Sequence, residues 1–81
     1  MNKKIASKVK EILSSILKIE NGIKDSDTIA SLNGDDVDCI ELQMALEETY
    51  NFSAGEDFVM VDMPVGNIIE RVCDVLLNPE K

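Results

Sequence analysis

The chain has 81 residues, of which 44% are hydrophobic, and this fits one small folded domain rather than a disordered segment. Its apolar runs are only a few residues long, so we expect no membrane insertion, and its lysine-interrupted N-terminus does not look like a secretory signal. Two cysteines are too few for a disulfide scaffold or a zinc site, and without an export signal they predict reduced thiols in a cytoplasmic protein. The sequence has no histidine, the commonest general base and metal ligand, which argues against most hydrolases and metalloenzymes.

The net charge of −8 is unevenly distributed along the chain. Residues 1–24 carry six lysines and two carboxylates, whereas residues 25–70 carry twelve carboxylates and no lysine or arginine. Such an acidic stretch repels nucleic-acid phosphates and anionic lipids, and it attracts basic protein surfaces. The alternative is a solvated acidic surface that only confers solubility.

The first predicted element is an amphipathic helix near the N-terminus, with lysines outside its apolar stripe. The stripe consists of Ile5, Val9, Ile12, Leu13, Ile16 and Leu17. Asn21-Gly22 is typical of a helix stop. Residues 21–35 are polar and rich in turn formers, and they predict a long structured loop anchored by Ile23, Ile29 and Leu32.

A second helix is predicted to begin near Asp35 and to run to about Tyr50 or Asn51. Asp35 can cap it, and Asp38 follows three residues later in a capping-box-like arrangement. Its core side is expected to hold Cys39, Leu42, Ala45, Leu46, Thr49 and Tyr50.

The remaining sequence predicts one short and one longer helix. Residues 58–61 have strand propensity but no obvious partner, so we favour a short helical turn beginning around residues 55–57. Pro64 suits the first turn of the last helix, which Asn78-Pro79 would end. Together these elements predict a single domain over residues 1–81, an all-α four-helix bundle of three main helices and one short helix.

The second helix has an additional apolar stripe opposite its core side. Val37, Ile40 and Met44 lie there, and the flanking acids are Glu41, Glu47 and Glu48. Isolated surface aliphatics are common and need no function. Apolar anchors and acids that coincide on one short helix instead favour a docking face for a basic partner.

Residues 32–50 read LNGDDVDCIELQMALEETY. This run resembles the signature of the acyl carrier proteins, which reads Leu-Gly-Ala-Asp-Ser-Leu-Asp followed by Glu-Leu and an acidic Met-Ala-Leu-Glu-Glu helix. The order of the predicted helices also matches that family over nearly the whole chain. The resemblance implies a non-enzymatic protein of fatty-acid, polyketide or related acyl metabolism. Acyl carrier proteins carry 4′-phosphopantetheine on the serine of this signature.

At the position of that serine the chain has Asp36. Attachment needs a hydroxyl that attacks a phosphorus of coenzyme A and leaves a durable phosphodiester, whereas a carboxylate would give an acyl phosphate that water cleaves. Ser31 and Ser53 lie outside the motif, and Thr49 is expected on the core side. We therefore expect no catalytic residue and no cofactor on this sequence. Asp36 could simply be a first-turn carboxylate that the helix dipole stabilises. Alternatively, its charge could imitate the phosphate of an attached phosphopantetheine, or it could be a substitution that blocks phosphopantetheine attachment.

The predicted function is docking, as a monomer, on basic surfaces of acyl-metabolism enzymes, without nucleic acid or membrane. The partner-binding residues would be Asp35, Asp36, Val37, Asp38, Ile40, Glu41, Met44, Glu47 and Glu48. The alternatives are a true carrier whose attachment serine has been substituted, and a structural or regulatory subunit of a multiprotein complex.

No metal site is predicted. Asp25-x-Asp27 fails as an EF-hand because Ile29 and Ala30 stand where a ligand and a glycine belong. Weak binding of divalent cations by the acidic helix stays open. Cys39 is expected to be a buried core thiol rather than a nucleophile.

Overall fold

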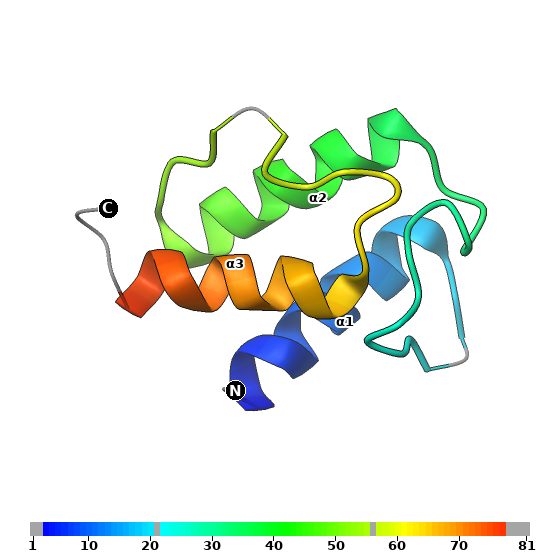
Figure 1. Cartoon of the computed structure of the whole chain (residues 1–81), viewed down its shortest axis with the longest axis horizontal. Coiled ribbons are helices and arrows are strands. Elements are labelled where there is room, and N and C mark those ends of the chain that lie inside the picture. The colour runs from blue at the N-terminus through cyan, green and yellow to red at the C-terminus, as the bar shows by residue number, and fades with distance from the viewer. Residues whose placement is uncertain (1–2, 21, 56, 78–81) are drawn as a thin grey trace.

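The computed structural model describes residues 3–20, 22–55 and 57–77. Within these ranges the chain forms three helices, α1 (Lys3–Leu17), α2 (Asp36–Tyr50) and α3 (Val65–Leu77), and no strand (Figure 1). Helix α1 packs against both α2 and α3. The described part of the chain contains no helix that is long and apolar enough to span a bilayer. The all-α architecture predicted from the sequence is therefore confirmed.

Aliphatic side chains from all three helices and from the first long loop fill the core. The fully buried members are Val9, Leu13, Ile29, Leu42, Leu46, Val65, Ile68, Ile69 and Val72. Helices α1 and α3 each bury one continuous stripe of their surface, as the helical spacing of their apolar residues predicts. Burial of such side chains is the main favourable term in the stability of a domain this small.

Helix α1 ends at Leu17, before the predicted stop at Asn21-Gly22. Lys18 adopts the left-handed conformation with φ 56°, and the Ile19 N–H donates to the Ser14 carbonyl at 3.0 Å. This is the bond of a Schellman-type end, formed here without glycine. The placement of the stop was therefore wrong, and residue 21 lies outside the described residues.

The predicted long loop between α1 and α2 is confirmed, and it packs onto the core. Ile23 and Ile29 are buried and Leu32 is partly buried. A Cβ atom on Gly34 would lie 2.5 Å from Ile29 Cγ2, so only glycine allows this close approach. The Gly34 N–H donates to the Ile29 carbonyl at 2.8 Å, which closes the loop just before α2 begins.

The same loop holds the beginning of α3 in place. The Val65 N–H donates to the Asp27 carbonyl at 2.8 Å, and the Gly66 N–H donates to the Asp25 carbonyl at 2.9 Å. Helix α3 begins directly after Pro64, in agreement with the predicted position. The predicted stop at residues 78–79 lies outside the described residues.

The short helix predicted to begin around residues 55–57 is not confirmed. The described residues between Asn51 and Pro64 form turns and irregular backbone, and residue 56 is outside them. Asp57 has φ 60°, which interrupts a right-handed helix. Side chains replace the missing helical hydrogen bonds, because Arg71 Nη1 donates to the carbonyls of Asp57 and Phe58 at 3.1 and 3.3 Å.

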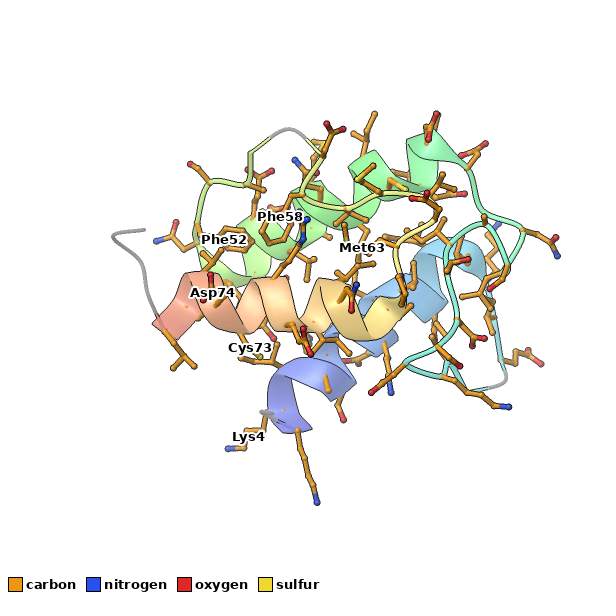
Figure 2. All side chains as sticks on the ribbon, viewed as in Figure 1. Lys4, Phe52, Phe58, Met63, Cys73 and Asp74 are labelled. Atoms are coloured by element: carbon orange, nitrogen blue, oxygen red, sulfur yellow. The ribbon has the colours of Figure 1, made fainter. Side chains whose placement is uncertain are left out.

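Helix α2 and an aromatic pair also hold this irregular segment. Gln43 Nε2 donates to the Gly55 carbonyl at 3.2 Å, and the Ala54 N–H donates to Glu47 Oε2 at 2.9 Å. Figure 2 shows Phe52 and Phe58 beside one another, with ring centroids 5.5 Å apart and planes tilted by 51°. The described residues of this segment are thus bonded to α2 and α3 without being helical (Figure 1).

Candidate docking face and groove

The start of α2 is fixed by two carboxylates. Asp35 is the N-cap, and its Oδ1 accepts hydrogen bonds from the N–H groups of Val37 and Asp38 at 3.1 and 3.2 Å. Asp38 Oδ2 accepts in return from the Asp35 N–H at 3.0 Å. This capping box confirms the predicted beginning of the helix.

Asp36 is the first residue of α2 and is exposed. Among the described residues its carboxylate has no hydrogen-bond or ion-pair partner, and it takes no part in the capping box that Asp35 and Asp38 form. The helix dipole stabilises a negative charge at this position. Asp36 therefore presents an exposed carboxylate at the N-terminus of α2.

The two faces of α2 are strongly different in exposure. Cys39, Leu42 and Leu46 are buried at 5% exposure or less. On the opposite side, the outward apolar residues keep about three fifths of their surface in solvent, with 60% for Val37, 59% for Ile40 and 62% for Met44. The predicted division of the helix into a core side and an outward side is thus confirmed for these residues.

One residue of the predicted core side is placed differently. Thr49 is exposed, whereas Ala45 and Tyr50 are partly buried. Thr49 lies in the last turn of α2, at the opposite end of the helix from Asp36. Ser31 is occupied in the loop, since it shares reciprocal hydrogen bonds of 2.9 Å with Thr28. Neither hydroxyl lies in the first turn of α2.

The acids beside the outward face have different roles. Glu41 and Glu48 are exposed, and within the described ranges they form no ion pair. Glu47 is partly buried, and its Oε2 accepts the hydrogen bond from the Ala54 N–H. Glu47 therefore ties α2 to the following loop as well as adding charge to the surface.

A groove of about 610 Å³ opens between the first half of α2 and residues 57–62. One wall comes from α2 and the other from the irregular segment. It is lined by Asp36, Cys39, Ile40, Gln43, Asp57, Val59, Met60, Val61 and Asp62. The sequence-based prediction missed the second wall. The signal was present, because Asp57 and Asp62 bracket the apolar run 58–61.

Cys39 lines this groove but remains largely shielded, with 5% of its surface exposed. Burial raises the pKa of its thiol, and the negative charges of Asp36, Asp38, Asp35 and Asp62 raise it further. A raised pKa keeps the thiol neutral near pH 7, and a neutral thiol is a poor nucleophile. The interpretation of Cys39 as a buried thiol is in keeping with this environment.

The structure brings no metal-binding cluster together in the part of the chain that it describes. Of the two loop carboxylates considered as possible ligands, Asp25 forms an ion pair with Lys10 at 2.6 Å. Asp27 Oδ2 accepts a hydrogen bond from the Lys24 N–H at 2.8 Å. These interactions give both residues a structural role.

The described residues form three helices, of which the second begins at an acidic cap and shows a second apolar face to solvent. Residues 7–72 match the family model of the phosphopantetheine attachment site. The chain belongs to this family, which includes the acyl carrier proteins. Members of the acyl carrier protein family are carriers rather than enzymes.

A curated relative supports the same assignment. The chain is 28% identical over 79 residues to the acyl carrier protein of Buchnera aphidicola subsp. Schizaphis graminum, with 95% of each chain covered. No solved structure matches the chain.

Proposed function

We propose that this protein is an acyl-carrier-protein-like docking protein that carries no covalent phosphopantetheine. It acts as a monomer and engages enzymes of fatty-acid, polyketide or related acyl metabolism through the outward face of α2. The observation that carries the proposal is Asp36, an exposed carboxylate at the first residue of α2 with no partner among the described residues, where the motif of the family has its attachment serine.

The residue at this position does not fit the group that the family carries. Transfer of phosphopantetheine requires an oxygen nucleophile that forms a stable phosphodiester, and Asp36 offers a carboxylate instead of a hydroxyl. Thr49 and Ser31, on the far turn of α2 and in the preceding loop, are not at the attachment position. We therefore derive no step that passes through a phosphopantetheine arm.

The outward face of α2 supports docking. Val37, Ile40 and Met44 are apolar and about 60% exposed, and exposed Glu41 and Glu48 stand beside them. Desolvated apolar anchors supply much of the binding energy of small interfaces, while the surrounding charge increases the association rate and selects a partner of opposite charge. The partner surface is accordingly expected to be basic with an apolar centre.

The test is mass spectrometry after incubation with coenzyme A and a broad-specificity phosphopantetheinyl transferase. The unaltered chain should keep its mass, whereas Asp36→Ser should gain one phosphopantetheine group. Ser31→Ala in the Asp36→Ser background is the matched control, and it should load as well as the single variant.

A mass increase on the unaltered chain would contradict the proposal directly. Failure of Asp36→Ser to load would show that the Asp35-x-x-Asp38 frame is not recognised by the transferase, and this would remove the assignment of Asp36 to the attachment position.

A further inference from the structure

We propose that Arg71 is a latch that keeps residues 57–60 in place beside α2, so that one side chain of α3 sets the position of the second groove wall. Arg71 acts through the backbone of this wall, and it is therefore a positioning residue rather than a binding residue. The inference goes beyond the proposed function and does not depend on it, because it concerns the free protein.

Arg71 is the only lysine or arginine between residues 25 and 77, and it bonds to backbone atoms of the wall. Its Nη1 donates to the carbonyls of Asp57 at 3.1 Å and of Phe58 at 3.3 Å. Hydrogen bonds from a charged donor are stronger than those between two neutral groups. These two bonds therefore tie the beginning of the wall to α3.

The far end of the wall is held independently of this tie. The Ala30 N–H in the loop before α2 donates to the Val61 carbonyl at 2.9 Å. At the near end, the Phe58 N–H donates to the Gly55 carbonyl at 3.3 Å, which is a contact inside the same irregular segment and not with a helix. Loss of the tie to α3 should therefore free residues 57–60 while Val61 stays attached to the first loop.

After release, the charge of Arg71 has a suitable environment on α3 itself. Asn67, Glu70 and Asp74 line a surface depression together with Arg71. Asp74 follows three residues further along the helix, a spacing at which side chains are neighbours. The released guanidinium thus lies among carboxylates and water. The cost of release is limited to the two hydrogen bonds and to the apolar surface of the wall, with no charge left in an apolar environment.

Cys39 on the floor of the groove reports the position of the wall. It lines the groove together with Val59 and Met60, and 5% of its surface is exposed while the wall is in place. Val59 is equally shielded, at 5%. Movement of the wall away from α2 would uncover both residues, and a thiol reacts with a reagent only when the reagent reaches it. The reactivity of Cys39 therefore measures how often the wall opens.

The experiment measures the alkylation of Cys39 by iodoacetamide, a small uncharged reagent, in the full chain with Cys73→Ala to remove the second thiol. Arg71→Gln should raise the rate constant about ten- to hundredfold, as the loss of two charge-assisted hydrogen bonds predicts. Arg71→Lys keeps a positive charge with its donors, so its rate constant should lie between those of the unaltered residue and Arg71→Gln. Mass spectrometry of timed samples gives each rate constant.

Two control variants separate the latch from general effects of charge. Asp57→Asn changes a side chain but keeps the backbone carbonyl that Arg71 binds. Lys8→Gln removes a cation from the surface of α1, where Lys8 pairs with Glu11 at 3.5 Å. Both should change the rate constant less than about twofold.

The dependence of alkylation on low urea concentrations separates local from global opening. Opening of the wall exposes little surface, so the rate constant of Arg71→Gln should rise with urea much less steeply than the unfolding constant does. An unchanged rate constant in Arg71→Gln would overturn the inference. A rise with the full urea dependence of global unfolding would also overturn it, because Arg71 would then only stabilise the whole fold.

An equal rise in Lys8→Gln would overturn it as well, because the effect would then be one of net charge. None of these results affects the proposed function, which is decided separately by the loading of Asp36→Ser.

Discussion

The inward and outward faces of α2 carry similar side chains in very different environments. Leu42 and Leu46 are completely buried, whereas Ile40 and Met44 keep about 60% of their surface in solvent. Helices α1 and α3 show no such duplication, since each gathers its apolar residues on one side, apart from exposed Leu77 at the end of α3. A helix whose apolar residues surround it is normally buried on all sides. In this small domain α2 is not, and the exposed half is therefore available to a partner.

The largest expected effect comes from truncating one leucine on the inward face. Leu46→Ala should lower the free energy of unfolding by about 2–5 kcal/mol, because it removes buried methyl groups and leaves a cavity. Met44→Ala on the outward face should change it by less than about 0.5 kcal/mol. Urea denaturation of both variants, followed by circular dichroism, makes the comparison. Equal losses of stability would show that the outward face belongs to the core and is not a docking surface.

Binding should reverse the order of these two faces. Met44→Ala should weaken the complex with a partner enzyme of acyl metabolism by about 1–2 kcal/mol, mainly through dissociation that is roughly five- to thirtyfold faster. Surface plasmon resonance with the immobilised partner enzyme measures both rate constants.

The charged residues of the outward face provide the matched control. The double variant Glu41→Gln and Glu48→Gln keeps the shape of the surface, so it should mainly slow association, and this difference should shrink at high salt. Unchanged rate constants in both the Met44 and the glutamate variants would place the docking surface elsewhere on the domain.

A smaller effect separates two adjacent carboxylates at the start of α2. Asp35→Ala removes the acceptor for two backbone N–H groups and should cost about 1 kcal/mol of unfolding free energy. Asp36→Ala removes only an exposed charge near the helix dipole, which should cost about 0.3–1 kcal/mol at low ionic strength and less as salt is added. Thermal melts at low and high salt compare the two. If added salt reduced the stability loss of Asp35→Ala as much as that of Asp36→Ala, the cap would act by its charge and not by hydrogen bonding.

Local rules were sufficient to predict the three main helices and the capping of α2. The apolar spacing of α1 and α3 and the pair Asp35 and Asp38 are short-range signals, and the structure confirms each of them. The true end of α1 was missed because Lys18, and not a glycine, adopts the left-handed conformation.

The segment between α2 and α3 could not be predicted in the same way. Its conformation depends on Arg71, Gln43 and Glu47, which bond to its backbone from two different helices. These contacts exist only once the bundle has formed, and the second wall of the groove depends on them. Sequence patterns therefore predicted the α2 face but not the groove beside it.

The smallest expected effect concerns Cys39, which lies on the inward side of α2 at the floor of the groove. Its thiol pKa is raised by burial and then by Asp36 and other nearby carboxylates. A group whose pKa is higher in the folded than in the unfolded state stabilises the fold fully below its unfolded pKa, which is about 8.5 for cysteine. This stabilisation is lost as the pH rises through the folded-state pKa.

The free energy of unfolding should therefore decline above about pH 8.5. Cys39→Ala should lack this part of the decline, so the stability difference between the two proteins should shift in favour of the variant between about pH 8 and pH 10. Asp36→Asn removes one of the carboxylates that raise the Cys39 pKa. The folded-state pKa should then fall towards its ordinary value, and the loss of stability at alkaline pH should become smaller. Urea denaturation across this pH range measures the difference, and a constant gap between the unaltered chain and Cys39→Ala would show that the thiol titrates alike in the folded and unfolded states.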